Sequence, residues 1–171
     1  MREDRHQNAV GLSILTVLII FLMSASSQVL AQGEPRAWAH FFGGIGGITG
    51  QGESEGILHV GGGGEGLIAS GFGVTGEIGY LALMRGFGGG VGVFSLGGLY
   101  AFNRDRKTVP FVNGGYTLFF RSGHEHGFFV GGGVNHWIGE RWGIRIEGRD
   151  QVFRDDTAVH ALEARFAIIL K

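Results

Sequence analysis

The feature that most constrains this chain is a series of apolar, glycine-rich runs separated by short polar breaks. The runs are about ten to fifteen residues long, the length of a tilted β-strand that crosses a bilayer. The short breaks suit antiparallel strands joined by hairpins, and none provides the helical crossover that parallel strands require. We identify eight runs, at residues 37–49, 57–68, 72–84, 87–102, 108–120, 127–138, 142–153 and 158–170. The sequence therefore predicts an all-β fold of eight antiparallel strands.

Side chains alternate in character within several of these runs. In residues 142–153, Ile144 and Ile146 alternate with Arg145, Glu147 and Arg149. Successive side chains of a strand point to opposite faces, so one face is apolar and the other is charged. A soluble sheet would turn the charges outward, whereas a membrane barrel would turn them inward.

Three observations favour the membrane arrangement. The chain has only two lysines, Lys107 and Lys171, although soluble sheets usually coat their wet face with lysine. Many of its 35 glycines fall in the runs, where a narrow barrel interior has little room for side chains. The charges on the polar faces nearly balance and could pair across a lumen. We therefore predict an interior charge network of Glu65, Glu77, Arg145, Glu147, Arg149, Glu163 and Arg165.

A sheet exposed to lipid cannot keep open edges, because unpaired backbone groups are costly in hydrocarbon. The eight strands should therefore close into an up-and-down transmembrane β-barrel. Eight strands make a small barrel whose interior is filled by side chains, which argues against a wide pore. Aromatic residues near the ends of the runs suggest interfacial girdles. We assign Trp38, Trp137 and Trp142 to these interfaces.

The N-terminal segment has the pattern of an export signal. Its apolar run, Gly11–Met23, is shorter than the roughly 20 residues of a spanning helix. Val29 and Ala31 suit a signal peptidase, so we expect residues 1–31 to be a cleaved signal peptide and residues 32–171 to form the barrel domain. Glu3 and Asp4 offset the nearby arginines, which leaves an uncleaved N-terminal anchor as the alternative.

Residues 36–171 resemble the outer membrane protein β-barrel domain family, which includes the barrel of outer membrane protein A and the opacity-type surface proteins. The resemblance rests on the signal segment, the eight glycine-rich runs, and the late strand GIRIEGRD followed by the closing strand EARFAIIL. It implies a Gram-negative outer membrane location, both termini in the periplasm, and assembly by the barrel-insertion machinery. It also leads us to expect no periplasmic peptidoglycan-binding domain. The chain departs from the family in ending at Leu170-Lys171 rather than at an aromatic residue.

Other motifs have simpler interpretations than catalysis or ligation. The stretch GGGGEG at 61–66 lacks the following helix that a phosphate loop needs. We assign His124, Glu125 and His126 to an exposed loop tip rather than a metal site. Ser95 has no histidine nearby in sequence to act as its base, and we interpret the Arg/Glu set as structural. We predict no catalytic residue, cofactor or metal. The net charge of −1 gives no indication of nucleic-acid binding.

The predicted function is that of a small outer membrane barrel with a structural or surface-interaction role, in contact with outer membrane lipid. An exported, soluble lipocalin-like barrel that binds a small apolar ligand is the main alternative. A lipid-modifying barrel enzyme is a further alternative. The sequence does not identify an extracellular or periplasmic partner.

Overall fold

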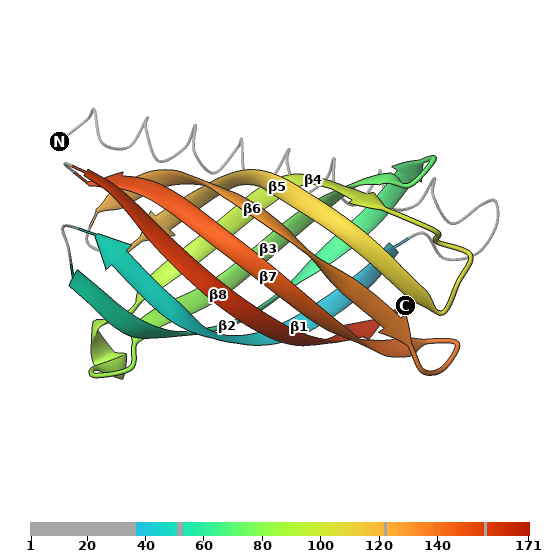
Figure 1. Cartoon of the computed structure of the whole chain (residues 1–171), viewed down its shortest axis with the longest axis horizontal. Helices are drawn as coiled ribbons and strands as arrows, with labels where there is room; N and C mark the ends of the chain where they lie inside the picture. The colour runs from blue at the N-terminus through green and yellow to red at the C-terminus, as the bar shows by residue number, and fades with distance from the viewer. Residues whose placement is uncertain (1–36, 51–52, 122, 156) are drawn as a thin grey trace, which may run out of the picture. The chain divides into compact units, whose positions relative to one another are not determined.

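The computed structural model describes residues 37–50, 53–121, 123–155 and 157–171. They form eight strands: β1 Ala37–Gly50, β2 Glu53–Ala69, β3 Phe72–Leu83, β4 Val91–Ala101, β5 Thr108–Phe120, β6 His124–Trp137, β7 Trp142–Asp155 and β8 Thr157–Leu170. Each strand pairs antiparallel with the next, and β1 also pairs with β8, so the sheet closes (Figure 1). The predicted eight-stranded antiparallel barrel is confirmed. The expected signal peptide, residues 1–31, lies outside the described residues.

Strand boundaries differ from the predicted runs where polar residues extend a strand. β5 coincides with its run, but β2 begins at Glu53 and β6 at His124, earlier than predicted. These polar residues continue the ladder at the end of the barrel opposite to the one where β1 begins and β8 ends. β4 begins later than predicted, because Phe87–Gly89 form a short 3-10 turn, η1. Among the described residues, no helix is long and apolar enough to cross a membrane.

The hairpin between β2 and β3 illustrates how the chain reverses tightly. Ala69 pairs with Phe72, which leaves Ser70 and Gly71 as a two-residue turn. Their φ angles are 49° and 93°, both in the left-handed region that a type I′ turn requires. Glycine at the second position adopts this conformation without a steric penalty.

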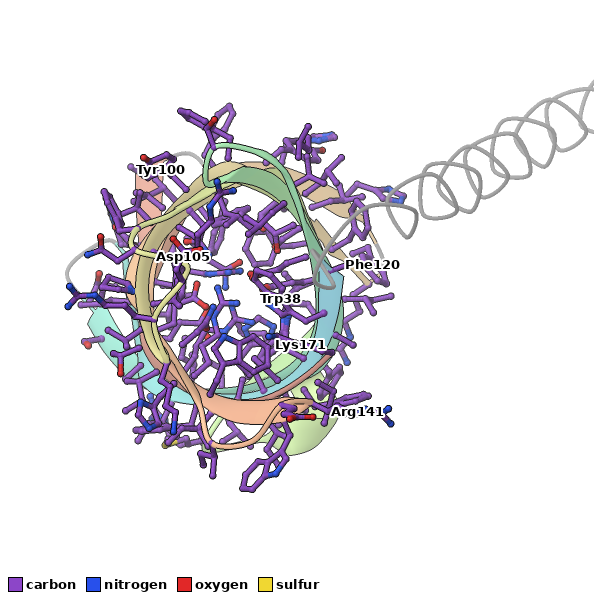
Figure 2. The ribbon with its side chains drawn as sticks, turned by 90° about the vertical axis from the view of Figure 1, so that its right-hand side faces the viewer. Trp38, Tyr100, Asp105, Phe120, Arg141 and Lys171 are labelled. Atoms are coloured by element: carbon purple, nitrogen blue, oxygen red, sulfur yellow. The ribbon has the colours of Figure 1, made fainter. Side chains whose placement is uncertain are left out.

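The two faces of the sheet are inverted relative to those of a soluble barrel (Figure 2). Ile144 and Ile146 are 42% and 53% exposed, while Arg145 and Arg149 are 2% and 1% exposed. The same alternation holds in β8, where Leu162 and Phe166 point outward and Glu163 points inward. An apolar outer wall around charged interior groups is the arrangement of a transmembrane barrel.

The strands are long enough for this role. β7 and β8 contain 14 residues each. At about 3.3 Å per residue and a tilt near 45°, such a strand rises about 33 Å along the barrel axis, more than the roughly 25 Å apolar band of an outer membrane barrel. The strand ends therefore reach beyond the hydrocarbon.

Candidate functional site

The interior of the barrel holds a group of charged side chains contributed by four strands. β7 supplies three of them at alternate inward positions, and β2, β3 and β8 supply the others. The structure places all seven residues of the proposed network in the lumen, none more than 5% exposed: Glu65, Glu77, Arg145, Glu147, Arg149, Glu163 and Arg165.

Two arginines of β7 connect carboxylates on three strands. Arg145 Nη1 lies 2.5 Å from Glu65 Oε1, and its Nε lies 3.0 Å from Glu147 Oε2. Arg149 Nη1 donates to Glu77 Oε2 at 2.5 Å, and its Nη2 lies 2.7 Å from Glu147 Oε1. Glu147 is therefore shared between two guanidinium groups, and the network links β7 to β2 and β3 across the lumen.

The two β8 residues of the network occupy different positions in it. Arg165 joins the main group, because its Nη2 donates to Glu77 Oε2 at 3.0 Å. Glu163 instead has His59 Nδ1 at 3.0 Å and also accepts a hydrogen bond from Gln151 Nε2. Among the described residues, His59 is the only basic group within 4 Å of the Glu163 carboxylate.

Two histidines belong to this interior and were not assigned to it from the sequence. His40 Nε2 donates to Glu77 Oε1 at 3.0 Å, and both His40 and His59 are almost fully buried. Charge counting could have suggested one of them, His59: the proposed network has four glutamates and three arginines, which leaves one carboxylate without a guanidinium partner. His59 also lies an even number of residues from Glu65, so both point to the same face of β2.

Aromatic rings complete the environment of the arginines. Each guanidinium lies over a phenylalanine ring: Arg145 over Phe111 at 3.8 Å, Arg149 over Phe129 at 4.3 Å and Arg165 over Phe42 at 3.5 Å from the ring centroid. Inward glycines make room for these groups. A Cβ at Gly61 would lie only 2.7 Å from the Phe42 ring. Cation–π contacts of this kind add to ion pairing when they are shielded from water.

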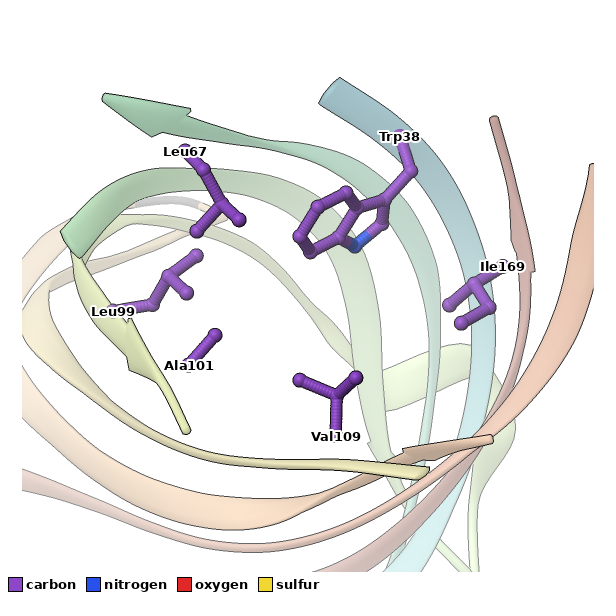
Figure 3. Packing of buried hydrophobic residues seen from close by; sticks show 6 residues of the cluster. All are labelled: Trp38, Leu67, Leu99, Ala101, Val109 and Ile169. Carbon is purple, nitrogen blue, oxygen red and sulfur yellow. The ribbon is translucent and has the colours of Figure 1, made fainter. Parts of the chain in front are cut away.

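Apolar clusters pack at both ends of the charged layer. At the end where β1 begins and β8 ends, the buried cluster is Trp38, Leu67, Leu99, Ala101, Val109 and Ile169, with Trp137 packed against it (Figure 3). At the other end it is Ile57, Leu81, Val93, Phe119 and Ala161. The lumen is therefore filled by a layered core, in which ion pairs lie between two apolar clusters. Such a core holds the strands in register.

The assignment of Trp38 and Trp137 to the membrane interface is wrong. Trp38 points into the barrel (Figures 2 and 3), and its ring meets that of Trp137 edge-on at 6.0 Å. Strand alternation explains this, because Trp38 shares its face with His40, and Trp137 shares its face with Asn135, both buried. Trp142 is exposed on the outside, as expected for an interfacial residue.

A different aromatic group lies on the outer wall, near the end of the barrel where β1 begins and β8 ends. The Phe72 and Tyr100 rings are 4.7 Å apart, as are the Tyr100 and Phe102 rings. Phe72 and Phe102 are well exposed. Their position at the strand ends suits a membrane interface, where aromatic side chains are enriched.

The prediction that His124, Glu125 and His126 form a loop tip is also wrong in part. They are exposed, but they form the first residues of β6, and His126 hydrogen-bonds with the hydroxyl of Tyr116. Within the described ranges, no group of three or more His, Cys, Asp or Glu side chains could hold a metal ion. The GGGGEG stretch continues β2, and Ser95 hydrogen-bonds with Thr117 inside the barrel.

No protein-family model and no curated protein matches the sequence. Solved structures do match the fold. Neisserial surface protein A aligns with a TM-score of 0.66 at 12% identity, over 82% of this chain and 99% of that one. The N-terminal β-barrel domain of Pseudomonas aeruginosa OprF gives 0.61 at 13% identity, over 81% and 98%. A de novo designed transmembrane β-barrel gives 0.52 at 12% identity, over 81% and 98%. This chain therefore has the fold of the small eight-stranded transmembrane barrels.

Proposed function

We propose that this chain is a small β-barrel of a Gram-negative outer membrane, with a structural or surface-interaction role rather than a pore or enzyme function. The observation that carries the proposal is the inverted sheet. Ile146 on the wall is 53% exposed, while its neighbours Arg145 and Glu147 are at most 3% exposed. Hydrocarbon is the surrounding medium in which this arrangement is favourable, because it keeps apolar groups in lipid and pairs the charges internally.

The topology supports the proposed orientation. With eight strands, β1 begins and β8 ends at the same end of the barrel, where Ala39 of β1 pairs with Leu170 of β8. We infer that this end faces the periplasm and that the barrel-insertion machinery assembles the chain.

The interior supports the absence of a pore. The charged layer is filled by paired side chains, and an apolar cluster lies on each side of it. A water-filled pore would need a continuous polar path between these layers. The proposed role therefore depends on the barrel wall and its exposed ends, not on transport through the lumen.

Fractionation of cells that express the full chain tests the proposal. We expect the mature protein to sediment with the outer membrane, to resist extraction by carbonate, and to require detergent for release. Unboiled samples should migrate differently from boiled ones on electrophoresis, because the closed barrel resists unfolding. Recovery as a soluble periplasmic protein without detergent would refute the proposal and favour the lipocalin-like alternative.

A further inference from the structure

Three exposed cations gather at the end of the barrel where β1 begins and β8 ends. They are Lys107 in the turn between β4 and β5, Arg141 in the turn between β6 and β7, and Lys171 after β8. We call them the rim cations, and Figure 2, which views the barrel from this end, labels Arg141 and Lys171. The same turns carry Asp105 and Glu140, but among the described side chains no carboxylate lies within 4 Å of a rim cation. The charge of the rim cations is therefore available to a group from outside the chain.

Contacts around Trp137, the last residue of β6, bring the three rim cations together. The backbone N–H of Trp137 donates to the carbonyl oxygen of Lys107 at 2.8 Å. Lys171 Nζ lies 4.3 Å from the centroid of the Trp137 ring. The backbone N–H of Lys171 also donates to the carbonyl oxygen of Arg141 at 2.8 Å. Residues far apart in the sequence thus place their cationic side chains on one sector of the barrel rim.

The described arginines in the turns at the opposite end of the barrel have partners within the chain. Arg85 forms an ion pair with Glu55. Arg121 Nη1 donates to the carbonyl oxygen of Gly89 at 2.6 Å, and its Nη2 donates to that of Gly88 at 3.1 Å. These two arginines connect loops to one another, whereas the rim cations make no such bond with their charged groups. The two ends therefore differ in the positive charge that they offer to a partner.

Lipid-facing residues lie directly beside the rim cations. Trp142 follows Arg141 in the chain, and Leu170 precedes Lys171. Trp142 and Leu170 pair in the ladder between β7 and β8, and both are well exposed on the outer wall. Ile138, which is also exposed, donates its backbone N–H to the carbonyl oxygen of Trp142. Cations that flank the last lipid-facing side chains of a membrane barrel lie at the depth of the lipid headgroups.

We propose that the rim cations bind the headgroup of an anionic glycerophospholipid. Its phosphate accepts charge-assisted hydrogen bonds from guanidinium and ammonium groups. A zwitterionic headgroup fits less well, because its own ammonium would be repelled by the rim cations. In the inferred orientation this end faces the periplasm, and the periplasmic leaflet of a Gram-negative outer membrane consists of glycerophospholipids. The inference rests on the proposed location and adds to it a preference for lipids of net negative charge.

Native mass spectrometry of the purified protein, released from detergent with added lipid, tests the proposal. The lipids are phosphatidylglycerol and phosphatidylethanolamine with the same acyl chains, so a difference in retention reports on the headgroup. The wild type should retain phosphatidylglycerol preferentially, and added salt should weaken this preference. Lys107→Gln/Lys171→Gln should lower the retention of phosphatidylglycerol by about tenfold or more. The matched control, Arg104→Gln/Arg106→Gln, removes the same charge from the same end but no rim cation, and should retain phosphatidylglycerol as the wild type does.

Three results would overturn the proposal. Equal retention of the two lipids by the wild type would remove the headgroup preference, and equal loss in the two double variants would show diffuse attraction to the whole end. Displacement of phosphatidylglycerol by a soluble glutamate peptide would assign the rim cations to an acidic polypeptide. Heat-dependent electrophoretic mobility checks folding, and Lys107→Gln/Arg141→Gln keeps Lys171 over Trp137 if its loss disturbs the barrel. Any of these failures, in a protein that fractionates with the outer membrane, leaves the proposed location intact.

Discussion

Replacing Arg149 by methionine tests whether the interior charges stabilise the barrel as a connected network. Methionine keeps most of the side-chain volume and removes the guanidinium that contacts Glu77 and Glu147. Removing one partner of a buried ion pair costs about 3–5 kcal/mol. Glu77 keeps Arg165 and Glu147 keeps Arg145, so we expect a loss at the lower end of this range. About 3 kcal/mol would lower the equilibrium constant for folding roughly a hundredfold.

Urea-induced unfolding in phospholipid vesicles, followed by tryptophan fluorescence, measures this loss. Trp38 and Trp137 report on it, because both rings lie in the apolar cluster at the end of the barrel where β1 begins and β8 ends. Arg104→Ala in the exposed turn between β4 and β5 is the control and should leave the midpoint unchanged. The double variant Arg149→Met/Glu77→Gln should lose less stability than the sum of the single changes. Equal stability of the Arg149→Met and Arg104→Ala variants would refute the network.

Three further predictions concern the interior ion pairs, the lipid-facing wall and the apolar clusters. His59→Leu should destabilise the barrel by about 3 kcal/mol, because it leaves the buried Glu163 without its nearest basic group. His124→Leu, at the exposed start of β6, is the control and should have no measurable effect on urea unfolding. Ile146→Lys should cost about 2–4 kcal/mol in vesicles, because it places a charge on the lipid-facing wall, and wild-type stability would contradict that placement. Planar bilayers that contain the protein should show no steady conductance, and an ohmic channel would show that the apolar clusters do not close the lumen.

Alternation in the sequence was sufficient to predict the fold and the inward face of several strands. In β7 and β8, apolar and charged residues alternate over most of the strand, so the two faces can be told apart from the order of the residues alone. Closure of the sheet followed from the free-energy cost of leaving the backbone groups of a strand edge unpaired in hydrocarbon. The seven charged residues of the proposed network were selected by this alternation, and the structure places them together in the lumen.

Alternation failed where both faces of a strand have similar character. β1 carries aromatic residues on both faces, Phe41 outside and Trp38 and Phe42 inside, so the sequence does not reveal that Trp38 faces the lumen. A tryptophan near a strand end can lie outside at the membrane interface or inside in an apolar cluster of the lumen. Only the register of β1 with its neighbours distinguishes the two positions.

Strand ends were mispredicted for a related reason. The polar residues that begin β2 and β6 look like loops if strands must be apolar, yet a barrel strand can continue past the hydrocarbon into water. The structure also pairs two outward-facing residues, since His160 Nδ1 lies 2.9 Å from Asp150 Oδ2, and the sequence analysis did not connect them. Asp150 and His160 become neighbours only when β7 turns back into β8, where Asp150 faces Leu162 and His160 lies one outward position further along.

The most direct test of the inverted sheet uses the absence of cysteine from the chain, which allows a single nitroxide label to be attached without competition. A label at Ile146→Cys, in vesicles, should collide more often with lipid-soluble oxygen than with a water-soluble nickel chelate. A label at Arg104→Cys in the exposed turn should show the opposite preference. Preferential collision of the Ile146 label with the nickel chelate would place the isoleucine face in water and contradict the account.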